Sequence, residues 1–228
     1  MTNHNELLKY VEWDVRNWGI ALDFWLAHST KRLSECKVLE IGTNTGRLSL
    51  WLASQGAKVI CSDVNRVRRE AVELHQSNGL AHLIEHQTID ATNIPYAEEF
   101  DIVVFKSVLG AIGDGAKEPQ TKAVSQMHKA LKKGGELFFA ENLVASPMHM
   151  FLRRKMISWG ETWRYVTIEE MNEFLAPFSE KRLRTIGFAG TFGRNEAQRN
   201  LLALGDKHIF ERIVPERWKY IIAGVATK

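Results

Sequence analysis

The sequence contains few cysteines and no long apolar segment. Its two cysteines, Cys36 and Cys61, form no C-x-x-C pair, and the first ten residues lack the apolar stretch of a signal peptide. A helix that crosses a membrane needs about 18 consecutive apolar residues, and the chain has no such run. These absences predict a reduced, cytoplasmic protein without a membrane span.

Charge of neither sign dominates the chain. It has 30 basic and 27 acidic residues, for a formal net charge of +3. This balance argues against a protein that coats nucleic acid, whose basic residues would cluster in a stripe, so no nucleic-acid partner is expected. With 228 residues, of which 45% are hydrophobic, the chain is typical of a single large α/β domain.

Strands and helices alternate along the first two thirds of the chain. Apolar side chains at helical spacing over residues 5–28 predict one or two helices, and a strand (37–41), a helix (47–56) and a second strand (58–62) follow. The next elements are predicted as a helix over 66–79, strands over 82–87 and 100–106, a helix over 121–135 and a strand over 136–141. Such alternation predicts a parallel sheet with helices on both faces.

The pattern changes after residue 141. Residues 143–165 mix methionines, aromatic residues and bases without a strand pattern. Thr167, followed by Glu170, is typical of a capped helix start. Two strands are predicted near the end, over 181–190 and 218–228, with a polar and partly helical segment between them.

The glycine turn after the first strand lacks the glycines of a dinucleotide motif. The pattern G-x-G-x-x-G, laid on Gly42, finds Asn44 and Arg47 at its second and third glycine positions. The remaining pattern is E-x-G-x-x-x-G from Glu40 to Gly46. An acidic residue, Asp63, ends the next strand about 20 residues on, where it could accept both hydroxyls of a ribose. Asn44 suits this turn, because asparagine adopts positive φ more readily than most residues.

This segment resembles motif I of class I S-adenosylmethionine-dependent methyltransferases, E/D-x-G-x-G-x-G, and the resemblance covers roughly residues 36–141. Residues 89–96 resemble the family's loop after the third strand, residues 100–113 its fourth strand and following loop, and residues 130–141 its next helix, glycine pair and fifth strand. The resemblance implies a Rossmann-like, seven-stranded, mostly parallel sheet with an antiparallel last strand and helices on both faces. It also implies an N-terminal helical extension and a lid after the fifth strand.

The resemblance implies S-adenosylmethionine as cofactor and assigns residues to it. Glu40 would orient the ammonium of the amino-acid tail, Asp63 would bind the ribose, and Asp90 and the backbone of Ala91 would bind the adenine. The full set of expected cofactor contacts is Glu40, Gly42, Thr43, Asn44, Thr45, Gly46, Asp63, Val64, Asp90, Ala91 and Lys106, with Trp13 and Trp18 of the N-terminal helices as a cover. Packing of these two tryptophans within their own helix is an equal alternative.

The family builds its acceptor pocket after the fifth strand. His149 or Glu141 would take the acceptor's proton there, while the basic and aromatic residues Arg153, Arg154, Trp163 and Tyr165 would bind the acceptor. A solvated basic helix turn, with its aromatics packed on the core, is the competing interpretation. The expected division is therefore one domain, with a helical cap over 1–34, a cofactor-binding core over 35–141 and an acceptor and lid region over 142–228.

Methyl transfer to oxygen of a small polar acceptor, such as a sugar or hydroxy acid, is the favoured function. The alternatives are a small-molecule N-methyltransferase and a non-catalytic protein that binds S-adenosylmethionine. No metal is expected, because Lys106 stands where related enzymes place a Mg²⁺-binding carboxylate, and His75, His82, His86 and His128 are expected on helix surfaces or strand edges. Residues 148–159 have a basic, amphipathic pattern, so a lipid-linked acceptor and peripheral membrane contact stay open. The oligomeric state is not indicated.

Overall fold

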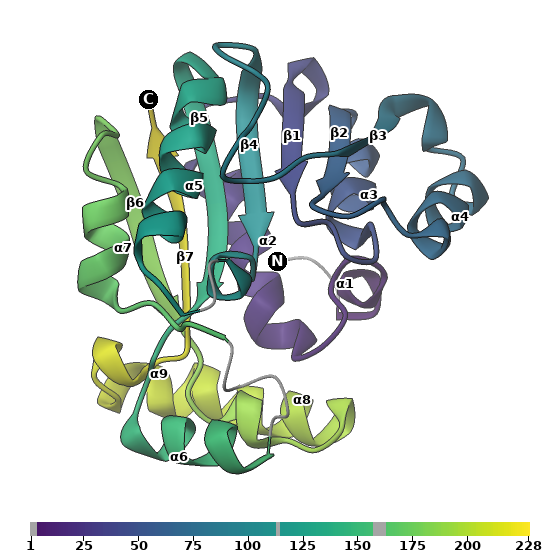
Figure 1. Cartoon of the computed structure of the whole chain (residues 1–228). Coiled ribbons are helices and arrows are strands. Elements are labelled where there is room, and N and C mark those ends of the chain that lie inside the picture. Colours follow the sequence, from purple (N-terminus) through teal and green to yellow (C-terminus); the bar gives the residue numbers. More distant parts are fainter. Residues whose placement is uncertain (1–3, 113–114, 157–162) are drawn as a thin grey trace.

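The computed structural model describes residues 4–112, 115–156 and 163–228, and its centre is one seven-stranded sheet (Figure 1). The strands are β1 (Lys37–Ile41), β2 (Lys58–Asp63), β3 (Ile84–Thr88), β4 (Phe100–Lys106), β5 (Leu131–Asn142), β6 (Glu180–Ile186) and β7 (Ile221–Thr227). They lie in the order β3-β2-β1-β4-β5-β7-β6. The first five strands pair in parallel, and β7 runs antiparallel to both of its neighbours. The predicted fold class, including the antiparallel last strand, is confirmed.

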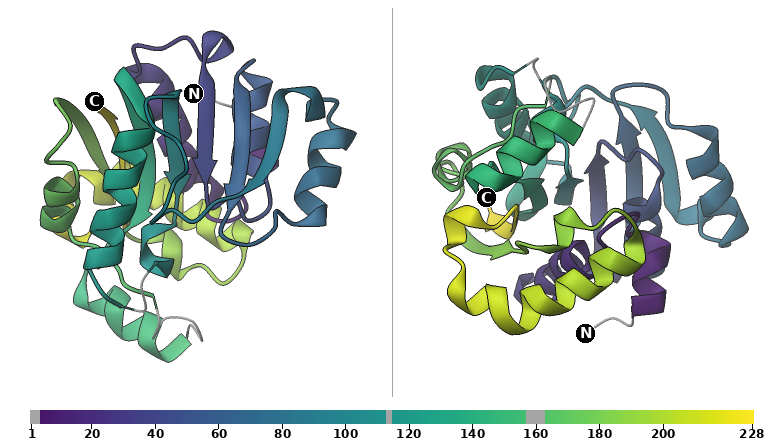
Figure 2. Two further views of the ribbon diagram at one scale, coloured as in Figure 1. Left: turned by 45° about the horizontal axis from the view of Figure 1, so that its top comes forward. Right: turned by 90° about the horizontal axis from the view of Figure 1, so that it is seen from below.

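Helices cover both faces of this sheet. In chain order they are α1 (His4–Tyr10), α2 (Val15–His28), α3 (Arg47–Ser54), α4 (Arg69–Ser77), α5 (Glu118–Ala130), α6 (Pro147–Met156), α7 (Ile168–Phe174), α8 (Glu196–Gly205) and α9 (Glu211–Ile213). Helices α5 and α7 lie in front of the sheet in Figure 1, and α2 lies behind it. Helices α6, α8 and α9 gather beyond one end of the sheet, which is seen from below in Figure 2.

Alternation along the strands divides the core into two clusters. Val38 of β1 faces the cluster that includes α2 and α3, while its neighbour Leu39 faces the cluster that includes α5 and α7. The same alternation appears in β4, where Ile102 and Val103 face opposite clusters. Successive side chains of a strand point to opposite faces, so the apolar runs in these strands place side chains in both clusters.

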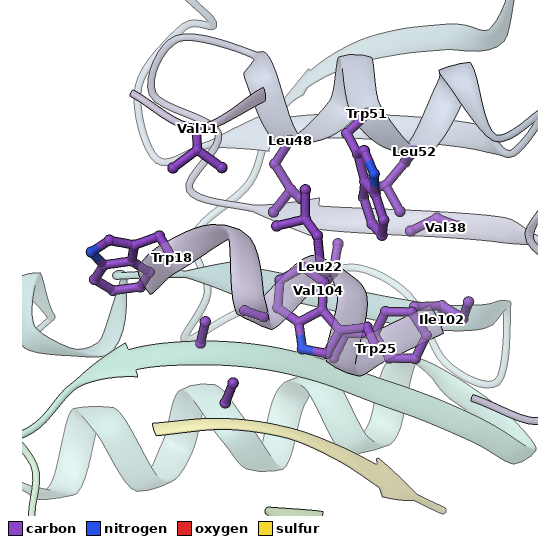
Figure 3. Packing of buried hydrophobic residues seen from close by; sticks show 14 of the residues in the cluster. Val11, Trp18, Leu22, Trp25, Val38, Leu48, Trp51, Leu52, Ile102 and Val104 are labelled. Carbon is purple, nitrogen blue, oxygen red and sulfur yellow. The ribbon is translucent and has the colours of Figure 1, made fainter. Parts of the chain in front are cut away.

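Trp25 of α2 anchors the N-terminal segment to the sheet (Figure 3). Its ring is fully buried and lies 6.0 Å from the ring of Trp51 and 5.7 Å from that of Phe138, measured between centroids. Its Nε1 donates a hydrogen bond of 3.2 Å to the carbonyl oxygen of Phe139 in β5. The predicted N-terminal helices therefore form part of the main core.

The junction of α5 and β5 differs from the sequence prediction. Helix α5 ends at Ala130 and pairing with β4 begins at Leu131, whereas a helix to residue 135 was expected. Gly134 has φ +68°, and a Cβ at Gly135 would lie 3.1 Å from the carbonyl oxygen of Phe100, so the glycine pair allows a kinked strand.

The predicted capped start of helix α7 is confirmed. The Thr167 side chain accepts from the Glu170 N–H, and the Glu170 side chain accepts from the Thr167 N–H.

Membrane crossing is not supported in the part of the chain that the structure describes. There, no helix is both long enough and apolar enough to span a bilayer.

We expect Trp25→Ala to lower the free energy of unfolding by about 3–5 kcal/mol, because it removes a large ring from a closed core. Urea denaturation of the purified chain measures this loss. Trp218→Ala makes the same change at a ring that is 40% exposed, and it should cost less than about 1 kcal/mol. Equal losses in the two variants would contradict the anchoring role of Trp25.

Candidate active site

A cleft lies at the carboxyl ends of β1, β2 and β4. It encloses about 860 Å³, and its walls come from the loops after these strands, the segment between α1 and α2, and Trp163. The sheet order reverses between β1 and β4, because β2 and β3 extend it on one side and β5 on the other. In open α/β sheets this switch point is where ligands bind.

The loop between β1 and α3 forms the floor of this cleft. Gly42, Asn44 and Gly46 all have positive φ, at +72°, +51° and +79°. A Cβ at Gly42 would lie 2.6 Å from Val108, and one at Gly46 would lie 2.7 Å from both Ala71 and His75. Glycine is therefore required at two of the three positions, and asparagine supplies the third left-handed residue as the sequence suggested.

Glu40 is buried below this loop, at the end of β1. Its carboxylate accepts a hydrogen bond of 2.9 Å from the Thr43 hydroxyl and another from the Ser49 hydroxyl. Burial raises the pKa of Glu40 to about 7, although both hydroxyls and the charge of Lys106 act in the opposite direction. The carboxyl group lines the cleft, where a ligand ammonium would favour its ionised form.

Two further carboxylates line the cleft beside the loop. Oδ2 of Asp63 accepts from the Asn44 N–H at 3.2 Å. Oδ1 of Asp90 accepts from the Thr92 N–H at 2.7 Å and from its hydroxyl at 2.9 Å, which fixes the turn after β3. Val64 and Ala91 lie next to them in the same wall. The structure thus brings together the predicted cofactor residues of the first three strand ends.

The N-terminal segment forms the opposite wall. Trp13 lines the cleft, as does Glu12, whose carboxylate accepts from the Thr45 hydroxyl and, at 3.4 Å, from Asn44 Nδ2. Trp18 is fully buried behind Trp13, with ring centroids 5.6 Å apart, and does not line the cleft. The predicted cover therefore fits Trp13 alone, and Trp18 packs in the core.

Lys106 closes the cleft at the end of β4. Its Nζ lies 4.9 Å from the centroid of the Trp18 ring. Burial lowers the pKa of Lys106, while the charges of Glu12, Glu40 and Glu141 partly offset this effect. The next residue, Ser107, has φ +57° and accepts a hydrogen bond of 2.6 Å from Asn142 Nδ2.

Several cleft residues were missed from the sequence. They include Tyr10, Glu12 and Pro119. These three stand outside the motif pattern, and chain segments distant in sequence bring them together. No local signal marks the break between two N-terminal helices as part of a cleft.

The structure brings Trp163 to the cleft but places His149 elsewhere. His149 is buried, with Nδ1 2.7 Å from the Ser146 hydroxyl and Nε2 2.9 Å from the carbonyl oxygen of Phe188. Burial lowers its pKa to about 4. Both ring nitrogens are engaged and neither reaches the cleft, so this position does not support the predicted role as a general base.

The other predicted acceptor residues also lie outside the cleft. The guanidinium of buried Arg153 donates to the carbonyl oxygens of Leu143 and Val144, and it stacks 4.0 Å from the ring of Tyr165. Both side chains therefore hold the segment after β5 together. Arg154 is exposed on α6, near the exposed apolar side chains Met148 and Phe151. His149 and Arg153 of the amphipathic pattern predicted over 148–159 are buried, residues 157–162 lie outside the described residues, and the membrane contact stays a prediction.

Glu141 supports the cleft without lining it. Its Oε2 accepts from the N–H groups of Val108 and Leu109 at 2.8 and 2.7 Å, and its Oε1 accepts from the N–H of Asn142 at 2.8 Å. Burial raises the pKa of Glu141, and these N–H groups oppose the change. The carboxylate holds the loop after β4, and this position does not support the predicted role as proton acceptor.

This fold and cleft define a class I, Rossmann-like methyltransferase domain. A family model described as "Methyltransferase domain" matches residues 18–188. The chain belongs to this family and is an S-adenosylmethionine-dependent methyltransferase domain, with S-adenosylmethionine as its cofactor.

Similar proteins act on different acceptors. A ubiquinone biosynthesis O-methyltransferase of Azotobacter vinelandii is 26% identical, with 60% of this chain and 62% of that protein covered. An arsenite methyltransferase of Mus musculus is 24% identical, with 58% and 37% covered. A solved Haemonchus contortus phosphoethanolamine N-methyltransferase 2 has a TM-score of 0.66 at 17% identity, with 99% of this chain and 57% of that one covered. The chain thus spans less than two thirds of the length of each of these relatives.

We expect Glu141→Gln to destabilise the fold and loosen the loop after β4. The amide keeps the shape but turns one acceptor into a donor that faces a buried N–H, which costs about 1–3 kcal/mol. Urea denaturation measures this loss, and calorimetric titration with adenosylhomocysteine should show weaker binding. Glu180→Gln, at an exposed position of β6, is the control. An unchanged denaturation midpoint in Glu141→Gln would contradict the assignment.

We expect cofactor affinity to rise with pH around the pKa of Glu40. The raised pKa leaves part of the carboxyl protonated near neutrality, and an ammonium bound beside it would favour the carboxylate. Binding of adenosylhomocysteine should release a proton, so affinity should increase between about pH 5.5 and 7.5. Calorimetric titrations across this range test it. Glu40→Gln should flatten the increase, and an equally steep increase in that variant would refute the role of Glu40.

Proposed function

We propose that the protein transfers the methyl group of S-adenosylmethionine to a small polar acceptor, with oxygen as the favoured nucleophile. The observation that carries this proposal is the convergence of Glu40, Asp63 and Asp90 on one cleft with the open loop from Gly42 to Gly46. A loop with three left-handed residues lets the backbone approach a ligand closely. Carboxylates suit a ligand that carries an ammonium, a sulfonium and two ribose hydroxyls.

The cofactor would lie along the loop in one orientation. Asp63 would accept from the ribose hydroxyls and Asp90, with Ala91, would hold the adenine, while Glu40 would orient the amino-acid tail. This direction turns the sulfonium toward the part of the cleft between Trp13, Lys106 and Trp163. Methyl transfer is a displacement at the sulfonium carbon, so the main task of this wall is to align the acceptor atom.

An oxygen acceptor must also lose its proton. Two cleft residues could take this proton: Glu12, which lies outside the expected cofactor contacts and has a carboxylate, and Lys106, an expected cofactor contact with an amine whose pKa burial lowers. We assign the proton to one of these two groups in place of His149 and Glu141. If the Lys106 amine is the base, measured kcat should fall in Lys106→Met and be kept in Glu12→Gln, and the opposite result would assign the proton to the Glu12 carboxylate.

The acceptor need not be acidic. Arg153 and Arg154 lie outside the cleft, and Arg47, which lines it, donates to the carbonyl oxygens of Leu8 and Lys9. The described acceptor wall is therefore aromatic and polar, with Lys106 as its cation. A small amine is the alternative acceptor, since relatives include an N-methyltransferase.

Incubation with tritium-labelled S-adenosylmethionine and a fractionated metabolite extract tests the activity. We expect label in a small molecule, and Asp63→Ala should bind adenosylhomocysteine about 1–3 kcal/mol more weakly because the ribose hydroxyls lose their partner. Asp63→Asn, which keeps the side-chain size, separates charge from shape. A wild-type chain that binds adenosylhomocysteine yet labels no fraction would instead be a non-catalytic cofactor-binding protein.

A further inference from the structure

Three metal-binding side chains converge beneath the cofactor loop. Cys61 of β2 and His86 of β3 are directly opposite in the parallel register, so both side chains point to the same face of the sheet. His75 of α4 packs against them on that face. One ligand atom from each of the three residues lies within 4.8 Å of the other two. His75 was expected on a helix surface, but it is fully buried.

Hydrogen bonds fix the tautomer of His75. Its Nε2 lies 2.8 Å from the carbonyl oxygen of Gly46, which can only accept, so Nε2 carries a proton. Nδ1 of a neutral His75 therefore presents a lone pair, and it lies 2.9 Å from Nε2 of His86. Metal-binding histidines usually donate their second N–H to a carbonyl or carboxylate in this way.

The three groups lie in surroundings that disfavour charge. Burial lowers the pKa of both His75 and His86. Burial also raises the pKa of Cys61 to about 12, and its thiol donates to the Thr43 hydroxyl at 3.2 Å. A free thiol in such surroundings is unreactive, whereas a bound cation stabilises the thiolate directly.

We propose that Cys61, His75 and His86 bind one zinc ion. One thiolate and two imidazoles form a borderline-soft donor set that suits zinc and disfavours magnesium or calcium. On binding, the Cys61 thiol releases its proton to solvent, and the proton on Nε2 of His86 moves to its Nδ1. His75 keeps its Nε2 proton and binds through Nδ1. Three protein ligands leave the fourth tetrahedral position to a water molecule.

The zinc site has a positioning role for the cofactor loop. None of its three ligands lines the cleft, so the ion would not touch the reacting groups. It would instead hold His75 against the carbonyl oxygen of Gly46. The contact is close, because a Cβ added at Gly46 would lie 2.7 Å from Nε2 of His75. The ion would thus connect β2, β3 and α4 to the loop that binds the cofactor.

Zinc binding by the full chain tests this site without any methyl-transfer assay. The protein is stripped with a chelator, titrated with zinc against a chromophoric competitor, and titrated separately with cobalt(II). We expect one zinc per chain and a thiolate-to-cobalt charge-transfer band. Both should be lost in Cys61→Ser and kept in Cys36→Ser, which changes the other buried free cysteine. Absence of zinc binding by the wild type, or equal loss in Cys36→Ser, overturns the proposal.

A second pair of variants keeps the test decisive if Cys61→Ser does not fold. His86 is only partly buried, so His86→Phe keeps a ring on the edge strand and removes the ligand atom, while His82→Phe makes the same change at an exposed histidine. Zinc should raise the thermal midpoint of the wild type and of His82→Phe, because it binds the folded chain. Zinc should leave the thermal midpoint of His86→Phe unchanged. An equal rise in His86→Phe overturns the proposal.

Discussion

The reversal of strand order between β1 and β4 is the constraint on which the site depends. The chain leaves β1 toward α3 on one face of the sheet and leaves β4 toward α5 on the other, as the membership of Leu48 and Val124 in opposite core clusters shows. The loops after β1 and β4 therefore diverge, and neither of them fills the space between the two strand ends. A cleft at the carboxyl ends of these strands is the direct result.

Buried carboxylates hold the two diverging loops. Glu40, at the end of β1, accepts from hydroxyls of the first loop and of α3, whereas Glu141, near the end of β5, accepts from three backbone N–H groups around the second loop. They differ in accessibility, because Glu40 lines the cleft and Glu141 does not. One can therefore respond to a ligand, while the other fixes backbone. Glu40 and Glu141 are both buried, but Glu40 accepts from side-chain hydroxyls and Glu141 from backbone N–H groups, so their roles differ.

The remaining walls come from distant parts of the chain. Glu12 and Trp13 precede the sheet in sequence, and Trp163 follows β5, yet all three face the same cleft. The zinc site that we propose would support the floor from below through His75 and the Gly46 carbonyl. The loops after the strands would thus hold the cofactor, whereas the N-terminal segment and the segment after β5 would contact the acceptor.

The sequence by itself determined the class of fold and the cofactor loop. Apolar strand runs, helical spacing and the residues from Glu40 to Asp63 are local patterns, and local backbone conformation follows from them. Thus Asn44 adopts the left-handed conformation that its position suggested. Which further polar side chains reach the cleft depended on the tertiary structure. His149 and Arg153 looked like acceptor residues because of their type, but packing turned them to backbone carbonyls, while Glu12, which no motif marked, lines the cleft. The reason is that a strand or helix pattern specifies the face on which a side chain lies, whereas its partners depend on segments that only folding brings together.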